Sequence, residues 1–227
     1  PGELNARANI DVLKRAGCTD ILAISAVGSL REEIEPGRFA VVEQFIDRTT
    51  QRANSFFGSG FVAHVSMADP VCPRLSEMAA VAIAGAKGKV ATGATYLAME
   101  GPQFSTRAES RMYRDWGADV IGMTAMPEAR LAREAELPYA LVGMVTDYDC
   151  WREGEAVDVA QVVAQMQVNG KLARAMVARL IKALPTEREP SPIDFALEDA
   201  VITAPDKHDP ALLAKLDAVA GRLLARG

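Results

Sequence analysis

Short, continuously apolar segments alternate with amphipathic segments along most of the chain, and this alternation limits the possible folds more than any other feature. The apolar segments cover residues 21–25, 39–46, 90–99, 118–123 and 139–146. Helix-like patterns occupy residues 4–17, 78–86, 127–135 and 157–184. Strands that are apolar at every position are typical of sheets buried on both faces. The sequence therefore predicts an α/β fold with a twisted, mostly parallel or mixed central sheet flanked by helices.

Small and polar residues stand where three of these apolar segments end. They are Ser25-Ala26, Met123-Thr124 and Thr146-Asp147. Ligands of such sheets gather at the carboxyl ends of the strands. We therefore expect these three stretches to form the walls of one pocket.

The composition excludes several classes of protein. A chain of 227 residues fits one large domain, and its net charge of −5 offers no basic surface for nucleic acid. No apolar run approaches the roughly 18 residues that a membrane span needs. The three cysteines are widely spaced and form no CxxC pair, a usage that suits a reducing cytoplasm. The sequence thus predicts a cytoplasmic protein with neither a nucleic acid nor a membrane as partner.

The segment VTDYDCW, residues 145–151, places Asp147 and Asp149 directly after an apolar run. A calcium loop would need a third oxygen ligand and then glycine where Trp151 and Arg152 stand, and no histidine is available at zinc-ligand spacing. A metal site is therefore not expected. Two interpretations stay open: a solvated turn, in which aspartate is common, and a pair of acids that binds and protonates a ligand. The aromatic neighbours Tyr148 and Trp151 favour the second.

Other motifs carry little weight. GSGFVA at Gly58 matches a dinucleotide-binding pattern, but no strand precedes it and no helix follows it. The chain has no phosphate-binding P-loop and no GxSxG elbow, and His64 and His208 are its only histidines. The sequence therefore predicts neither a nucleotide cofactor site nor a serine or cysteine triad.

Several longer motifs occur together and in order. They are SAVGSLREEIEPG at Ser25, FIDRTTQRANSFF at Phe45, GPQFSTRAES at Gly101, GADVIGMTAMPEARLAREAELPY at Gly117 and VTDYDCW at Val145. Together they resemble the purine nucleoside phosphorylases, and among these most closely the 5′-methylthioadenosine phosphorylases. The resemblance extends from residue 1 to about residue 183 and implies the three-layer fold of that family.

The resemblance also implies an activity and a set of site residues. Family members cleave a purine nucleoside with inorganic phosphate and use neither a metal nor an organic cofactor, so we expect methylthioadenosine to yield adenine and 5-methylthioribose 1-phosphate. By resemblance, Asp147 would protonate purine N7 and Asp149 would accept from the 6-amino group. The other implied contacts are Ser105 and Phe104 at the base, Met123 and Phe104 at the ribose, and Ser25, the Ala26 N–H group and Thr124 at the phosphate. Ser25 replaces a threonine of the family, and Gly122 stands where some relatives have asparagine.

The chemistry of the reaction explains why two close carboxyl groups would be useful. The leaving purine gathers negative charge, which a carboxylic acid at N7 neutralises. Two aspartates in a poorly hydrated pocket resist ionising together, so one is expected to stay protonated near neutral pH. Related enzymes that prefer 6-oxopurines carry asparagine at the position of Asp147. We keep two alternatives: a 6-oxopurine or methylthioinosine phosphorylase, and a non-catalytic purine-binding protein.

An apolar helix face follows the aspartate pair. Val159, Val162 and Val163 match the family's apolar wall for the 5′-methylthio group. Helical spacing alone would equally predict that these valines pack against the core. Both interpretations stay open.

The resemblance also bears on the extent and assembly of the protein. We expect residues 1–227 to form a single domain that is incomplete at its N-terminus, with residues 185–227 as a linker and a last amphipathic helix of the same domain. Family members carry an earlier strand, a glycine-rich phosphate turn and an arginine–histidine pair, which are expected to precede residue 1. The resemblance further implies a homotrimer.

Overall fold

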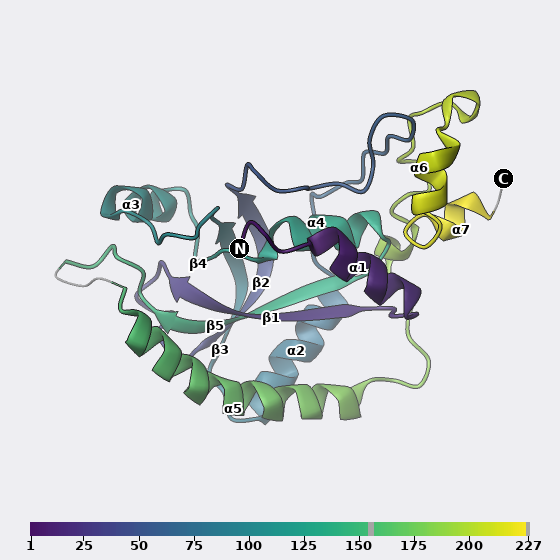
Figure 1. The fold of residues 1–227 in the computed structure, drawn as a ribbon. Helices are drawn as coiled ribbons and strands as arrows, with labels where there is room; N and C mark the ends of the chain where they lie inside the picture. The colour runs from purple at the N-terminus through teal and green to yellow at the C-terminus, as the bar shows by residue number, and fades with distance from the viewer. Residues whose placement is uncertain (154–156, 226–227) are drawn as a thin grey trace.

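The computed structural model describes residues 1–153 and 157–225, and this part of the chain forms one sheet of five strands. The strands are β1 (Ile21–Ser29), β2 (Phe39–Asp47), β3 (Val90–Ala98), β4 (Val120–Gly122) and β5 (Tyr139–Asp147). They pair in the order β1-β4-β3-β2-β5, and β5 also pairs with β1, so the sheet closes into a barrel (Figure 1). Each predicted apolar segment forms one of these strands.

The barrel is mixed rather than parallel throughout. β1 with β5, β2 with β3 and β3 with β4 are parallel pairs. β1 with β4 and β2 with β5 are antiparallel. The sequence does not predict the closure, because it rests on short contacts between distant segments, such as Phe39 with Met144 and Gly28 with Ile121.

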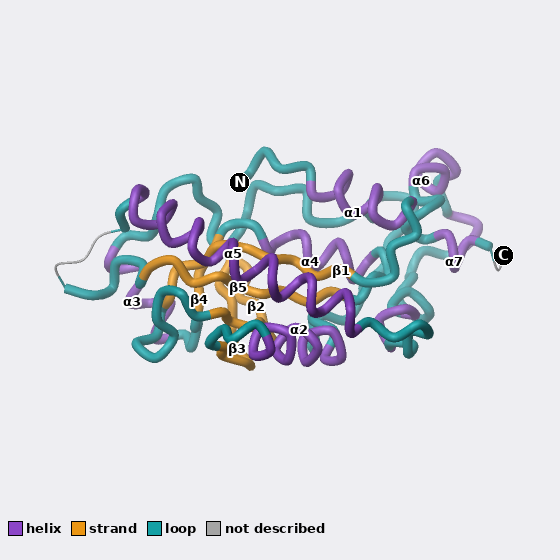
Figure 2. Tube along the Cα trace, turned by 90° about the horizontal axis from the view of Figure 1, so that it is seen from below, coloured by secondary structure: helices purple, strands orange, loops and turns teal. Residues whose placement is uncertain are grey.

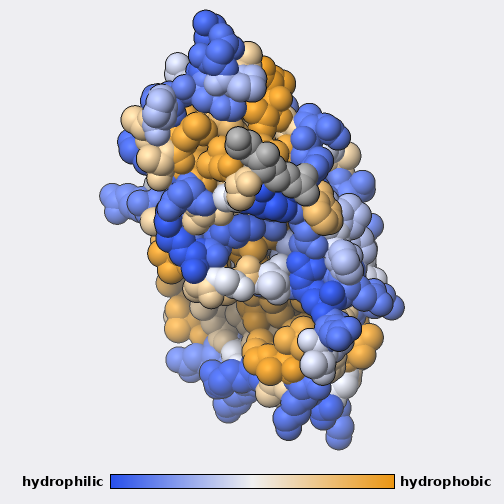
Figure 3. Space-filling model, turned by 90° about the vertical axis from the view of Figure 1, so that its right-hand side faces the viewer, coloured by the Kyte–Doolittle hydropathy of each residue, from blue (hydrophilic) through white to orange (hydrophobic). Residues whose placement is uncertain are grey.

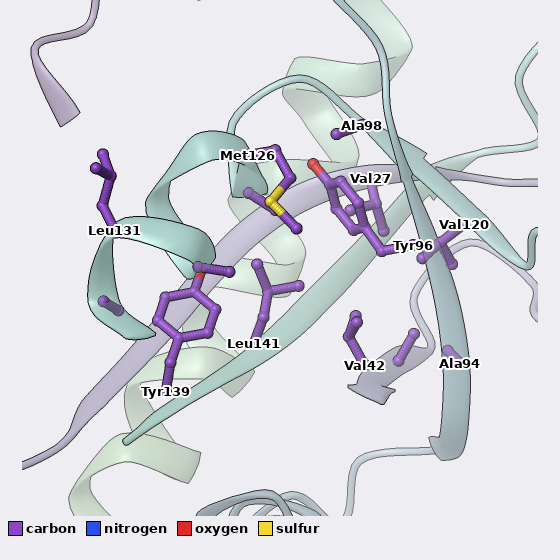
Figure 4. Packing of buried hydrophobic residues seen from close by; sticks show 14 of the residues in the cluster. Val27, Val42, Ala94, Tyr96, Ala98, Val120, Met126, Leu131, Tyr139 and Leu141 are labelled. Atoms are coloured by element: carbon purple, nitrogen blue, oxygen red, sulfur yellow. The ribbon is translucent and has the colours of Figure 1, made fainter. Parts of the chain in front are cut away.

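Helices cover the sheet on two sides. On one side, α1 (Ala6–Arg15) and α4 (Ala125–Glu134) pack against β1, β3 and β5 in a cluster that contains Tyr96, Tyr139 and Leu131. Figure 4 shows this cluster, with Tyr96 at one end and Tyr139 and Leu131 at the other. On the other side, α2 (Pro73–Gly85) and α5 (Val159–Ala183) pack together over β2 and β5, as Figure 2 shows. The predicted arrangement of helices on both faces is therefore confirmed.

One helix was absent from the predicted pattern. α3 covers Arg107–Asp115 and begins with a capping box, in which the Thr106 hydroxyl accepts from the Glu109 N–H and the Glu109 carboxylate accepts from the Thr106 N–H. Ser110 and Tyr113 are its buried residues. So few buried positions leave almost no apolar periodicity, although the capping signal itself is present in the sequence TRAE.

The C-terminal segment differs from its prediction. The expected last helix forms two short ones, α6 (Pro210–Lys215) and α7 (Gly221–Leu224). Between them, Leu216 and Ala220 are buried in a cluster with Phe61, and Val219 is buried against the central cluster that contains Tyr96 and Leu131. Seen from the side of this segment, hydrophobic patches lie among hydrophilic ones (Figure 3).

Within the described residues, no helix combines the length and the apolar character that crossing a membrane requires. The strand, glycine-rich turn and arginine–histidine pair expected ahead of residue 1 stay a prediction.

Candidate active site

A cavity of about 300 Å³ lies at the ends of β4 and β5, beside the last residues of β1. It is lined by residues 25–28, 121–124 and 146–147, together with Pro1, Met99, Phe104, Asp149 and Val162. The three stretches that were expected to form one pocket therefore do meet. A larger cavity of about 450 Å³ between β2, β3 and α2 contains none of the predicted site residues.

The wall formed by β1 differs from the prediction. Ser25 and Ala26 do not end the strand, because β1 continues to Ser29. On the side of β1 that faces β4, only Gly28 and Ser29 pair with another strand of the described sheet. The edge of β1 before Gly28 is therefore open on this side, and residues 25–28 line the cavity. An unpaired strand edge presents free N–H and C=O groups. The expected amide donor to an anion would thus come from a strand edge rather than from a turn.

The aspartate pair is fixed by the backbone where β5 ends. The Asp149 N–H donates to Asp147 Oδ1 at 2.8 Å, and the Thr146 hydroxyl donates to Asp147 Oδ2 at 2.7 Å. Asp149 has a positive φ of 53°, is 6% exposed and carries a buried Oδ2 without a hydrogen-bond partner. The solvated-turn interpretation is therefore wrong. A buried oxygen left unpaired is costly unless a ligand satisfies it.

Both carboxyl groups hold their protons more tightly than usual. Burial raises the pKa of Asp147, while the hydrogen bonds from Thr146 and the Asp149 N–H partly oppose this rise. Burial also raises the pKa of Asp149, and the nearby Asp147 charge adds to that rise. The nearby Ser110 hydroxyl lowers the pKa of Asp149 in part. This hydroxyl is buried and forms no hydrogen bond of normal geometry. Both shifts favour the protonated form, which is the direction that a general acid requires.

Two hydroxyl groups face each other across the cavity wall. Ser25 Oγ lies 3.1 Å from Thr124 Oγ1, so residues 99 positions apart in the sequence meet at one point. Ala26 lines the cavity beside them. Hydroxyl groups and free backbone amides are suitable donors to an anion such as phosphate.

The packing of Tyr96 explains why position 122 is a glycine. A Cβ atom there would lie 2.1 Å from the hydroxyl oxygen of Tyr96, a residue of β3 that is 0% exposed. The same hydroxyl accepts from the Thr124 N–H at 3.4 Å. Tyr96 thus fills the space that an asparagine at position 122 would need.

Not all predicted residues reach the cavity. Phe104, Met123 and Val162 line it, whereas Ser105 does not. The Ser105 hydroxyl instead donates to Met99 Sδ at 3.7 Å.

The two remaining valines point elsewhere. Val159 and Val163 are 60% and 47% exposed and do not line the cavity. Neither interpretation of this helix face is therefore correct for these two residues within one chain, because they neither form a cavity wall nor pack in the core.

Two neighbours of the site, Tyr96 and Arg52, were not predicted, and Thr146 was predicted only as part of a pocket wall, without its hydrogen bond to Asp147. Thr146 and Tyr96 contact the predicted residues through single hydroxyl groups. Arg52 donates to backbone carbonyl groups beneath the cavity. Thr146 precedes Asp147 in the sequence, and Arg52 lies in the motif FIDRTTQRANSFF. These positions were the signals in the sequence that could have pointed to a role for either residue.

Comparisons with known proteins agree with this geometry. Over 227 residues the chain is 57% identical to the S-methyl-5′-thioadenosine phosphorylase of Bradyrhizobium diazoefficiens, covering 99% of this chain and 78% of the relative. It is 58% identical to the enzyme of the same name from Cereibacter sphaeroides, with the same two coverages.

Solved structures show the same likeness. A methylthioadenosine phosphorylase from an Antarctic soil metagenomic library superposes with a TM-score of 0.91 at 42% identity, covering 96% of this chain and 78% of the other. A variant of the Schistosoma mansoni adenosine/methylthioadenosine phosphorylase in complex with adenine superposes with a TM-score of 0.80 at 37% identity. The match covers 83% of this chain and 74% of the other. The sequence model of the Phosphorylase superfamily matches residues 2–182, which contain every residue of the cavity wall except Pro1. The chain therefore belongs to the phosphorylase superfamily.

Proposed function

We propose that the protein cleaves S-methyl-5′-thioadenosine with inorganic phosphate and releases adenine and 5-methylthioribose 1-phosphate. The observation that carries this proposal is the Asp147–Asp149 pair: both residues line the cavity, and the buried Asp149 has an Oδ2 atom without a hydrogen-bond partner. A purine 6-amino group would satisfy that oxygen, and a protonated Asp147 would serve N7. Relatives at 57% and 58% identity carry the name of this activity.

The remaining residues are assigned by their places around the cavity. Phosphate would lie against the Ser25 and Thr124 hydroxyl groups and the edge of β1 at Ala26, and ribose would lie against Met123. Phe104 is 44% exposed and would cover the sugar and the base. Val162 would contact the 5′-methylthio group, and Ser105 would contact the base only if its side chain moved away from Met99.

The proposed reaction balances without a cofactor. A phosphate oxygen attacks the ribosyl C1′ atom while the bond from C1′ to the purine N9 breaks. Asp147 gives its proton to N7, so the purine leaves as a neutral molecule. Asp147 later regains a proton, equivalent to the one that the hydrogen phosphate dianion loses on becoming an ester. The proposal therefore requires inorganic phosphate as co-substrate and neither a metal nor an organic cofactor.

The decisive test is an assay of the full-length protein on methylthioadenosine, methylthioinosine and adenosine, each with and without phosphate. We expect phosphate-dependent release of adenine from methylthioadenosine at the highest rate. A protonated Asp149 could donate to a 6-oxo group, so faster cleavage of methylthioinosine would favour the 6-oxo alternative. Release that ignores phosphate, or binding of adenine without any cleavage, would overturn the proposed reaction.

We also propose that the protein is a homotrimer, as the family resemblance implies. Support comes from large apolar side chains that one chain leaves in water near the cavity: Phe104, Val159, Val163 and Met166 are between 41% and 60% exposed. Burying such side chains in a subunit contact is favourable. Light scattering across a range of protein concentrations should give a molar mass three times that of one chain. A mass that stays at one chain would contradict the assembly.

A further inference from the structure

Arg52 is a buried arginine that has no role in the reaction proposed for this site. Its side chain is 6% exposed, and its Nε donates to Glu100 Oε1 at 2.8 Å. Nη1 donates to the carbonyl oxygens of Met123 and Met126, both at 2.6 Å. Nη2 donates to the carbonyl oxygens of Glu100 at 2.7 Å and Met99 at 3.3 Å. One guanidinium group therefore binds four backbone carbonyls and one carboxylate.

These carbonyls belong to two different walls of the cavity. Met99 and Glu100 follow β3, in the segment that leads to Phe104. Met123 follows β4 and Met126 lies in the first turn of α4, so the two residues flank Thr124. Arg52 thus connects the wall proposed to cover the sugar with the wall proposed to bind ribose and phosphate.

Glu100 anchors the arginine from the other side. Besides Arg52, its carboxylate accepts from the N–H groups of Thr50 at 2.5 Å and Gln51 at 3.1 Å. The Thr50 N–H, followed by Arg52, lowers the pKa of Glu100 to about 2. Glu100 therefore stays ionised across the physiological range and fixes the loop that carries Arg52.

Only arginine suits this position. Its planar fork offers five N–H donors in fixed directions, whereas lysine has three donors on a single nitrogen. A lysine could neutralise Glu100 but could not reach carbonyls on both walls at once. Nothing in the contacts of Arg52 reaches β5, where Thr146 and the Asp149 N–H fix the base-binding carboxylate of Asp147.

We propose that Arg52 is a positioning residue for phosphorolysis, which sets the Met123–Thr124 segment against the base site on β5. The inference rests on the proposed function. It predicts that phosphate binding and turnover depend strongly on Arg52. Binding of the purine base alone should depend on it much less, because the two carboxyl groups proposed to bind the base lie on or just after β5 and only Phe104 lies in a segment that Arg52 contacts. A residue that merely stabilised the fold would affect both kinds of binding alike.

The test compares Arg52→Lys with the unaltered full-length protein. We expect kcat to fall and KM for phosphate to rise by about 10- to 100-fold, because a displacement near 1 Å can cost that much. The dissociation constant for adenine, measured by calorimetry, should change by less than about threefold, well below the change in KM for phosphate. The matched control is Arg188→Lys, which alters another arginine with several hydrogen bonds, 24% exposed, whose partners Asp194, Glu189 and Thr19 lie outside the cavity. It should lower thermal stability without changing KM for phosphate.

A second variant covers the case in which lysine disturbs folding. Arg52→Ala leaves a cavity that guanidinium ion can fill, so added guanidinium at millimolar concentration should restore part of the phosphate-dependent turnover, and methylammonium should not. The proposal is overturned if adenine and phosphate binding weaken together, if kcat and KM stay at the unaltered values, or if neither variant folds. If the unaltered protein binds adenine but performs no phosphorolysis, the proposed function fails instead.

Discussion

Replacing Asp147 by asparagine should lower kcat/KM for methylthioadenosine by about 100- to 10,000-fold, the usual contribution of a general acid. Asparagine has nearly the same shape and can still accept the Asp149 N–H, but it has no acidic proton for purine N7. The fold should persist, because the variant removes a carboxyl group that burial makes costly to ionise. Steady-state kinetics on the two proteins, with thermal unfolding as the check on folding, measures the effect.

The pH dependence provides an independent test of the same assignment. Because the acid form of Asp147 is the active one and its pKa is raised, kcat/KM should fall as the pH rises through that raised value. Stability should change in the same direction. The folded protein binds these protons more tightly than the unfolded chain, so the contribution to the free energy of unfolding is present below the ordinary pKa of 3.8 and is lost as the pH rises through the raised one. Asp147→Asn should lose the alkaline fall in kcat/KM and part of the stability slope.

Substrate preference is the third readout for this variant. Asparagine at position 147 should raise the ratio of methylthioinosine to methylthioadenosine cleavage, because losing the proton at N7 should cost adenine more than a 6-oxopurine, whose leaving group can also carry negative charge on its 6-oxygen. Asp149→Asn is the comparison variant, since it alters the carboxyl group assigned to the 6-amino group: it should change the same ratio but keep the alkaline fall in kcat/KM. An unchanged ratio in Asp147→Asn, or loss of the alkaline fall in both variants, would remove the assignment of separate roles to the two aspartates.

The strands were predictable because a continuous apolar run indicates a strand that is buried on both faces. The segment at residues 139–146 is almost the whole of β5, and the segment at residues 39–46 is almost the whole of β2. β1 was predicted four residues too short, since Ala26, Gly28 and Ser29 look like a turn. Their strand geometry depends on pairing with β5 and β4, which lie about a hundred residues away in sequence and leave no local signal.

The place of the site was predictable from the ends of the strands and from the family resemblance. Asp147, Asp149 and Thr124 were expected there and do meet in one cavity, whereas their roles at a ligand stay a prediction. Residues that act through the backbone were missed, because any loop can supply the carbonyls that Arg52 binds. Val159 was misplaced for a different reason: helical spacing predicts an apolar face, but does not say whether the same chain covers it.

Glu136 controls how the C-terminal segment joins the rest of the molecule. It is 4% exposed and lies just after α4, where it accepts Arg222 Nε at 2.8 Å and Arg222 Nη2 at 2.6 Å. Its Oε1 also accepts from the Leu197 N–H at 3.0 Å. A single carboxylate thus satisfies one buried amide and one guanidinium that come from two separate parts of residues 185–227.

Replacing Glu136 by alanine should lower the free energy of unfolding by about 3 kcal/mol, the lower end of the cost of breaking a buried ion pair. The lower end applies because Arg222 is 25% exposed and keeps its contact with Glu198, whereas the Leu197 N–H is left unsatisfied in the core. Urea unfolding measures the loss. Asp217→Ala is the control, since it breaks an ion pair with Arg15 in which both side chains are exposed, and it should cause no measurable change. Equal losses in the two variants would show that burial of Glu136 does not decide the strength of this junction.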